Sequence, residues 1–431
     1  MRACKLAFRD GVREVSTADR VNATSSADKS IATIDDAALA AALIAPGSTP
    51  ANKRELRLDL FRGGALWLIF IDHVSPDLLS WFTIRSYGFC DAAEIFIFIS
   101  GYTAAIVYGR AISNSGFIVG SARILKRVWQ IYAAHVILFA IYVGEITFLS
   151  AQFKTQFFIE EMGLKILFTQ PDFTIIQALV LRFCPLNMDV LPLYIVLMLF
   201  LPAILWMMRR LPDVTLSLSV LLYVLTWKYD LYLHAYPKGF WAFNPFAWQM
   251  LLVAAVWCAL GGAKRLSAIL SSPITLGIAV AYIAAAFFVT LTWYFPELAQ
   301  VIPHRVEQFI YPIDKTDLDI LRFVHFLALA VIAVRLVPKG WAGLESPWLK
   351  PMILCGQNSL QIYCLGVVLA FAGYFILIQS GSGILVHILI GVLGILMMSA
   401  VAVLFTWYKR ATDKAKLASP RIATKDTAPG F

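Results

Sequence analysis

About ten stretches of this 431-residue chain are long and apolar enough to cross a lipid bilayer, and no other feature limits its fold as strongly. A helix needs roughly 20 residues to span the ~30 Å hydrocarbon layer. Hydrophobic residues make up 60% of the chain and charged residues only 15%, which is far from a soluble composition. We therefore expect an all-α, polytopic membrane helix bundle. We exclude a soluble enzyme, a nucleic-acid-binding protein and a secreted disulfide-stabilised domain.

The ten expected transmembrane helices occupy most of the chain after residue 57. Their approximate bounds are 59–74, 91–108, 128–149, 190–208, 214–227, 246–260, 274–294, 320–337, 352–378 and 384–407. The first is short and contains Asp59, Arg62, Asp72 and His73. Because ionisable side chains are costly in lipid, this helix is expected to lie inside the bundle.

Lysine and arginine are distributed unevenly between alternate connections, and this asymmetry predicts the orientation. If the N-terminus is cytoplasmic, the cytoplasmic connections hold basic pairs such as 209–210 and 264–265, whereas the longer outer loops hold isolated basic residues. An even number of spans then leaves both termini in the cytoplasm. The same topology accounts for the net charge of +9.

The segments outside the expected bundle are polar. Residues 1–52 and 411–431 contain too few apolar residues to bury, so we expect disordered cytoplasmic tails on either side of a transmembrane domain at 53–410. The six cysteines show no metal-ligand spacing, and no metal site is expected. Cys90 and Cys184 both fall on the predicted outer side, where a disulfide between them is permitted.

Ionisable residues concentrate in the first two expected helices. His73 lies near the outer end of the first, and Arg62 lies eleven residues, or ~16 Å, below it. A histidine can take a proton from a hydroxyl group and return it to a leaving group, and a nearby carboxylate can orient the ring. Because adjacent helix positions point about 100° apart, that carboxylate belongs to Asp72, Asp91 or Glu94. The structural alternative is a polar Asp72-His73 pair at the membrane interface.

Several other polar residues have structural as well as functional interpretations. Asp91 suits a helix N-cap as well as it suits catalysis. Asp59 and Arg62 are spaced to form an i,i+3 pair. Small residues such as Ser100-Gly101 are typical of closely packed transmembrane helices.

A second polar group lies near the outer ends of later helices. Arg322 and His325 share one face of the eighth expected helix, and Asn244 and Gln249 lie beside the start of the sixth. His135, in the middle of the third, is more typical of a packed, hydrogen-bonded histidine than of a catalyst.

Six segments together resemble a known family. They are LDLFRG at 58–63, IDH at 71–73, GFCDAAEIFIFISG at 88–101, FNPFAWQ at 243–249, LRFVHFLALA at 321–330 and CGQNSL at 355–360. In this order they resemble the OpgC-type family, which succinylates osmoregulated periplasmic glucans and is grouped with the transmembrane acyltransferases. The resemblance covers most of the chain from about residue 55 to 380.

The resemblance implies transfer of an acyl group from cytoplasmic succinyl-CoA to hydroxyl groups of a periplasmic glucan. The catalytic residues that it implies are His73, Asp72, Asp91 and Glu94. The donor-binding residues would be Arg62, Asp59 and Ser100. The acceptor-binding residues would be Arg322, His325, Asn244 and Gln249. Asn358 stands where we expect the family often to carry histidine, and this difference puts a minor second-site role in question.

The expected partners are acyl-CoA, a periplasmic glucan and the bilayer of a bacterial inner membrane, with no nucleic acid and with the oligomeric state left open. Two other functions stay open. The intramembrane charges also suit a secondary transporter or exporter of a polar solute, although paired, glycine- or proline-interrupted spans are not evident. An acetyltransferase acting on another surface polysaccharide is the second. The sequence does not decide between direct transfer and an acyl-histidine intermediate.

Overall fold

The computed structural model describes residues 55–74, 78–381 and 383–418. Within these residues the chain is helical and has no strand, only an isolated bridge between His234 and Phe240. The longer elements are α2 (Leu56–Val74), α3 (Ala92–Gln152), α7 (Val190–Arg210), α8 (Pro212–Tyr229), α9 (Pro245–Trp257), α12 (Pro273–Tyr294), α14 (Ile320–Leu336), α15 (Lys350–Gln357), α16 (Ser359–Gln379) and α17 (Ile384–Ala418).

Short helices fill the connections. They are η1 (Leu79–Phe82), η2 (Ile84–Tyr87), α4 (Phe157–Glu161), α5 (Lys165–Thr169), α6 (Pro171–Leu179), the π-helical η3 (Cys258–Gly262), α10 (Ala263–Arg265), α11 (Ser267–Ser271), η4 (Pro296–Val301), α13 (His304–Ile310) and η5 (Ala342–Glu345). The expected N-terminal tail at 1–52 lies outside the described residues. So do residues 419–431 of the expected C-terminal tail.

Six helices in the described part of the chain are long and apolar enough to cross a membrane. They are α3, α7, α9 with its continuation to Arg265, α12, α16 and α17. This finding confirms the expected all-α membrane protein. The expected first, fifth and eighth spans appear as α2, α8 and α14, which are helices but are not among the six.

The expected second and third spans form one 61-residue element, α3. A straight helix of that length would extend about 90 Å, three times the hydrocarbon thickness. The helix is interrupted at Gly116, whose φ of 80° and ψ of 165° are not helical. Ile112 and Gly120 lie side by side, because a Cβ atom on Gly120 would meet Ile112. The chain therefore turns back at Gly116, and the two halves of α3 are separate rods.

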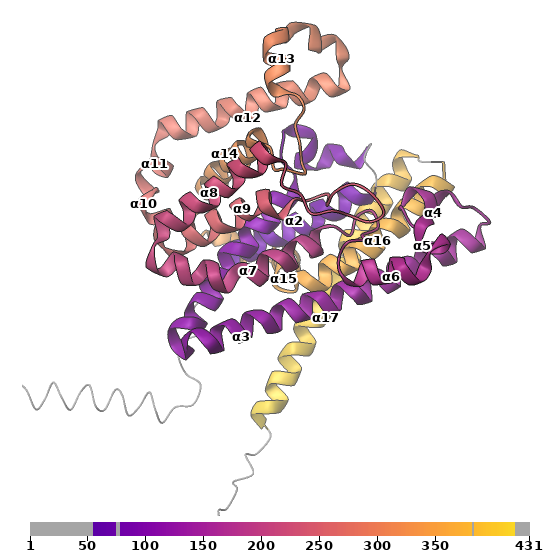
Figure 1. Ribbon diagram of the computed structural model, residues 1–431, viewed down its shortest axis with the longest axis horizontal. Helices are drawn as coiled ribbons and strands as arrows, with labels where there is room; N and C mark the ends of the chain where they lie inside the picture. The colour runs from indigo at the N-terminus through magenta and orange to yellow at the C-terminus, as the bar shows by residue number, and fades with distance from the viewer. Residues whose placement is uncertain (1–54, 75–77, 382, 419–431) are drawn as a thin grey trace, which may run out of the picture. The chain divides into compact units, whose positions relative to one another are not determined.

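The expectation that the first helix lies inside the bundle agrees with the packing of α2. This helix contacts α3, α15, α16 and α17, and these helices surround it in Figure 1. Its side chains Arg57, Asp59 and Arg62 are all buried. A helix with this many ionisable groups is stable at the centre of a membrane protein only because its neighbours shield it from lipid.

The contact between α2 and α15 is exceptionally close. A Cβ atom on Gly63 would overlap the carbonyl oxygen of Met352, and one on Gly356 would overlap the carbonyl oxygen of Asp59. Backbones approach this closely only where both helices present glycine. A similar contact joins α3 to α9, where a Cβ atom on Gly101 would lie 3.1 Å from the carbonyl oxygen of Leu252. Gly101 therefore has the packing role expected of it.

The helices around α2 have defined directions. Phe70 lies beside Gly366 and Val74 beside Gly373, so α2 and α16 run in the same direction. Met398 lies beside Gly366 and Ile390 beside Gly373, so α17 runs in the opposite direction. The beginning of α2 and the end of α17 therefore lie at the same end of the bundle. We call this the α2-start end.

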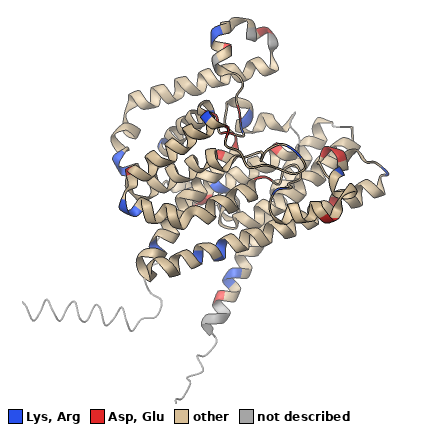
Figure 2. Cartoon of the chain, in the orientation of Figure 1, with Lys and Arg blue, Asp and Glu red and all other residues tan. Residues whose placement is uncertain are grey.

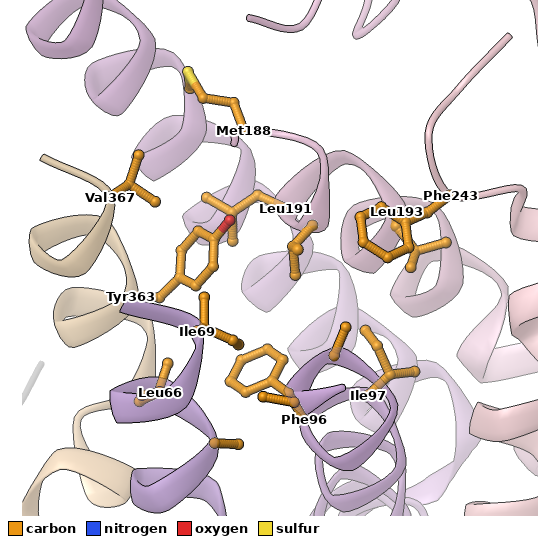
Figure 3. Close-up of a cluster of buried hydrophobic side chains, with 14 of the residues drawn as sticks. Leu66, Ile69, Phe96, Ile97, Met188, Leu191, Leu193, Phe243, Tyr363 and Val367 are labelled. Carbon is orange, nitrogen blue, oxygen red and sulfur yellow. The ribbon is translucent and has the colours of Figure 1, made fainter. Parts of the chain in front are cut away.

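Figure 2 shows the basic residues on α3, near α10 and on the last turns of α17. The last turns of α7 and α10 carry Arg209, Arg210, Lys264 and Arg265. These are connections that the sequence assigns to the cytoplasm. The core where α2, α3, α7 and α16 meet is apolar, and Leu66, Phe96, Leu191 and Tyr363 converge there in Figure 3.

Candidate functional site

His73 occupies the last turn of α2. Its Nδ1 lies 2.5 Å from the carbonyl oxygen of Ile69, one turn earlier. A carbonyl oxygen only accepts hydrogen bonds, so Nδ1 carries the proton and Nε2 has a lone pair in the neutral ring. The ring of His73 has no second hydrogen-bond partner within residues 55–74, 78–381 and 383–418. This histidine is therefore oriented as a proton acceptor.

A small cavity lies beside His73, between α2 and α16. Its volume is about 10 Å³, which is room for roughly one water molecule. The lining residues are Leu66, Ile69, Phe70 and His73 of α2 and Ile362, Tyr363, Gly366 and Val367 of α16. His73 is the one ionisable group besides the Tyr363 phenol in this lining. The cavity is therefore an apolar space with a proton acceptor at the end farther from the α2-start end.

Asp72 points away from this cavity, toward the segment between α2 and α3. The hydroxyl of Thr83 lies within hydrogen-bonding reach of the Asp72 carboxyl group. The second oxygen, Oδ1, is buried and has no hydrogen-bond partner among the described residues. The charges of Lys315, Asp91 and Arg85 lie near enough to act on both Asp72 and His73. The upper end of α2 thus faces a group of charged side chains from three other segments.

The head of α3 forms a complete capping box. The carboxyl group of Asp91 accepts from the backbone N–H of Ala93 at 2.8 Å, and Glu94 Oε2 accepts from the backbone N–H of Asp91 at 3.0 Å. This arrangement satisfies donors that the first turn of any helix leaves without partners. The capping interpretation of Asp91 is therefore confirmed by geometry. It explains why two carboxylates stand together at this point of the sequence.

Two cations neutralise these carboxylates. Arg322 of α14 lies 2.6 Å from Glu94 Oε1 and 3.3 Å from Asp91 Oδ2, and Lys315 Nζ lies 2.6 Å from Asp91 Oδ2. We call Asp91, Glu94, Lys315 and Arg322 the α3-head cluster. Its arginine and both carboxylates are buried, while Lys315 is nearly half exposed. A buried set of two anions and two cations is balanced in charge, and removing one member leaves an uncompensated charge.

His325 lies one turn beyond Arg322 and is 2% exposed. Its Nδ1 is 3.1 Å from Cys90 Sγ, and its Nε2 is buried and has no partner among the described residues. A Cβ atom on Gly88 would overlap the ring of His325, so glycine permits this approach. Cys90 and Cys184 are both free thiols, and the permitted disulfide between them is wrong. Cys90 instead packs against the imidazole.

Asn244 and Gln249 both hold loops and helices together. Asn244 caps α9 by accepting from the backbone N–H of Phe246, and its Nδ2 donates to Asp317 Oδ1 and the carbonyl oxygen of Leu231 at 2.7 Å each. Gln249 exchanges hydrogen bonds with Ser219 of α8, at 2.7 and 2.9 Å. Their polar atoms already have protein partners: Asn244 joins the loops before α9 and α14, and Gln249 joins α8 to α9.

Asp317, the partner of Asn244, also accepts a hydrogen bond from the Tyr232 hydroxyl at 2.6 Å. This bond to a carboxylate raises the pKa of Tyr232 above its ordinary value, because it stabilises the protonated phenol. The long loops before α9 and before α14 are thereby joined through one buried carboxylate.

The residues expected to bind the donor lie nearer the start of α2 and on the adjoining part of α3. Arg62 donates to the carbonyl oxygen of Ile99 at 3.2 Å and to the Thr103 hydroxyl. Its Nη1 is 4.0 Å from Asp59 Oδ1, the i,i+3 spacing expected of this pair. Ser100 is buried on the same part of α3. Arg62 therefore places a positive charge at the contact between α2 and α3, below the cavity.

The site contains residues that the sequence did not point out. Lys315 is one of them, although it is the one lysine in the acidic segment DKTDLD at 314–319. That pattern is a signal for an ion pair. Tyr363 and Gly366 lie within a long apolar span and gave no signal. No group of three potential metal ligands occurs within the described ranges.

Comparison with known proteins identifies the family. A family model described as OpgC protein matches residues 54–410, which is most of the chain. No curated protein and no solved structure matches the chain significantly. The match includes α2, the α3-head cluster and the whole helical bundle through α17 as far as residue 410. The resemblance drawn from the sequence segments is confirmed: the chain belongs to the OpgC family, and this membership indicates a membrane protein of the acyltransferase type.

Proposed function

We propose that the protein transfers an acyl group, with succinyl preferred, from cytoplasmic acyl-CoA to a hydroxyl group of a periplasmic glucan. His73 is the general base of this reaction. The protein acts in the inner membrane of a bacterium, and both termini of its chain lie in the cytoplasm. Family membership supports acyl transfer, and the basic connections support the orientation.

The orientation of His73 is the observation that carries this proposal. Its Nδ1 is occupied by the carbonyl oxygen of Ile69, so the proton-accepting nitrogen is Nε2. A general base needs this fixed tautomer and access to the reacting hydroxyl group.

The reaction balances with this one histidine. Nε2 takes the proton of the glucan hydroxyl as its oxygen attacks the thioester carbonyl carbon. The new C–O bond forms, the C–S bond breaks, and the CoA thiolate leaves with the proton that the imidazolium returns. In a two-step route, Nε2 itself attacks the thioester carbonyl carbon and the CoA thiolate leaves. The glucan hydroxyl then attacks the acyl carbon of acyl-His73, the C–N bond to Nε2 breaks, and the hydroxyl proton passes to the CoA thiolate, because Nδ1 is already protonated. Trapping an acylated His73 in the absence of glucan distinguishes the second route from the first.

The position of His73 suits a reaction whose substrates occupy opposite sides of the membrane. An acyl-CoA remains in the cytosol and a periplasmic glucan remains outside. Arg62 and His73 lie on one helix, about 16 Å apart along its axis. This distance approaches the length of an extended pantetheine arm, so the thioester can reach His73 while the nucleotide stays at the α2-start end.

The α3-head cluster supports a positioning role rather than direct contact with substrate. Arg322 is bound to Glu94 and Asp91, and Asn244 is bound to Asp317. We propose that these residues hold the outer loops in place above His73. Lys315 is the exception, because its half-exposed ammonium group lies near His73 and remains accessible to an anionic acyl group.

The direct test is acyl transfer by purified protein in proteoliposomes, with radiolabelled succinyl-CoA and glucan. His73→Ala should reduce transfer by at least about 10²-fold, the lower bound for loss of a general base. His304→Ala is the matched control, since His304 is exposed on α13 and its hydrogen bonds within the described part of the chain are to Glu307 and Gln308 of the same helix. Equal transfer by the two variants would remove the mechanism.

The same assay separates the alternatives. A transporter would leave the glucan unlabelled in wild-type protein. An acetyltransferase would label the acceptor from acetyl-CoA and not from succinyl-CoA. The proposal requires that the glucan is labelled faster from succinyl-CoA than from acetyl-CoA.

A further inference from the structure

The cavity between α2 and α16 has no role in the proton transfer itself, yet His73 closes its upper end. Its α2 lining, Leu66, Ile69, Phe70 and His73, follows the i, i+3, i+4, i+7 pattern of one helix face. The cavity begins four residues above Arg62 and ends at His73. The residues that line it on α2 therefore cover most of the interval between Arg62 and His73, although the cavity itself has room for only about one water molecule.

The chemistry of the lining limits what this space can hold. Its side chains are apolar apart from His73 and Tyr363, and the Tyr363 hydroxyl is directed toward the carbonyl oxygen of Asn187, 3.5 Å away. Figure 3 shows that hydroxyl pointing toward the segment with Met188 and Leu191. A sugar placed here would leave its hydroxyl groups without partners, at a cost of a few kcal/mol each. A thioester sulfur and the two methylene groups beside it would lose no hydrogen bond by entering, so the space suits this end of the donor's arm and not its amide groups.

Gly366, one of the lining residues, has room for a side-chain carbon atom. A Cβ atom on Gly366 would lie 3.4 Å from Met398 Cε and 3.9 Å from Phe70 Cβ, which are ordinary contacts. Gly366 is therefore not required by close packing, unlike Gly63 and Gly356. Glycine at this position keeps space open one turn below His73. Behind it stands Met398, whose unbranched side chain readily changes conformation.

We propose that the seam between α2 and α16 seats the thioester end of the donor's pantetheine arm, and that Gly366 keeps this seat open. This inference rests on the proposed acyl-CoA-dependent function and identifies the path of the donor within it. The arm enters from the α2-start end, follows Leu66 and Phe70 and delivers the thioester to His73. The cavity is narrower than the arm in the present conformation, so binding must displace Met398 or separate the two helices slightly.

The test compares a probe that contains the arm with a probe that lacks the arm and one phosphate group. CoA contains the pantetheine arm, whereas 3′,5′-ADP contains the nucleotide alone. Binding of each is measured to wild-type protein and to Gly366→Ala and Gly366→Val in detergent micelles. We expect the dissociation constant for CoA to rise several-fold in Gly366→Ala and at least tenfold in Gly366→Val. The dissociation constant for 3′,5′-ADP should stay unchanged.

Gly109→Val is the matched control. Gly109 is also a helical glycine with room for a Cβ atom, since its nearest neighbour, Leu260 Cδ2, would be 3.7 Å away. It does not line the cavity. If Gly366→Val does not fold, Gly366→Ala decides the question, because a methyl group fits there without strain.

Two results would overturn the inference. Unchanged CoA affinity in folded Gly366 variants would show that the arm lies elsewhere. Parallel loss of CoA and 3′,5′-ADP affinity would show that the variants act on the nucleotide site. These results leave acyl transfer by the wild-type protein intact. In contrast, wild-type protein that binds no CoA would contradict the proposed function itself.

Discussion

The two faces that α2 presents to the segment 350–379 are packed differently: one is in direct backbone contact with α15, and the other leaves a cavity against α16. Toward α15, Gly63 and Gly356 bring the two backbones into contact and leave no space for a single methyl group. Toward α16, the same helix leaves a cavity in which Gly366 has ordinary clearance. Glycine on the first face allows the helices to meet, and glycine on the second keeps them from filling the space beside His73.

The largest expected loss of stability comes from adding a methyl group at the contact between α2 and α15. Gly356→Ala would place a methyl group onto the carbonyl oxygen of Asp59, and neither backbone can move without separating α2 from α15. We expect a loss of at least about 3 kcal/mol, the upper part of the range for overpacking. Thermal unfolding of the purified variant in detergent would show a greatly lowered midpoint or no folded protein. A midpoint equal to that of wild type would mean that the close contact is not present.

A smaller loss of stability is expected from replacing the residue that lies between α15 and α16. Asn358 separates α15 from α16, and its amide donates to Thr406 at 2.9 Å and accepts from Lys409 Nζ at 2.7 Å. Asn358→Ala removes these bonds to the end of α17 and should cost about 1–3 kcal/mol. The unfolding midpoint in detergent measures it. Asn358→His tests whether the residue expected more often in the family fits here, and full stability of Asn358→Ala would exclude the anchoring role.

The smallest expected change in stability is that of Gly366→Ala, and it should be stabilising where the other two substitutions are destabilising. Gly366→Ala adds a methyl group where there is room and replaces a poor helix former with the best one. Stability should be unchanged or rise by up to about 1 kcal/mol, even though donor binding weakens. The comparison with Gly356→Ala uses the same substitution on neighbouring helices. A marked destabilisation by Gly366→Ala would abolish the distinction between the two faces.

The positions of the helices along the chain could be predicted from the sequence better than the contacts between them. A helix lies at each of the apolar stretches, and six helices of the described chain are long and apolar enough to cross a bilayer. The stretch 352–378 was expected as one span, but it is divided at Asn358 into α15 and α16. The acidic pair Asp91 and Glu94 matched a capping box, whose spacing is local. The hydropathy pattern predicted two separate spans within the part of the chain that forms α3, but it did not show that the turn between them lies at the single residue Gly116.

The site could be predicted only in part, for the same reason. His73 and Asp72 stood out because ionisable residues in a transmembrane helix are rare. The pairing of Arg322 with Glu94 joins residues 228 positions apart, and no local pattern specifies it. Tyr363 and Gly366 look like ordinary members of an apolar helix. Their importance follows from which face of α2 lies opposite, and that is a property of the assembled bundle.

The central claim is that His73 is the meeting point of a donor from one side and an acceptor from the other. The most direct measurement is a cryo-EM structure with a non-hydrolysable thioether analogue of succinyl-CoA. The account predicts the nucleotide at the α2-start end, the sulfur between α2 and α16 beside Gly366, and the reacting carbon within about 3.5 Å of His73 Nε2. A nucleotide bound at the α3-head cluster, or an acyl group out of reach of His73, would contradict it.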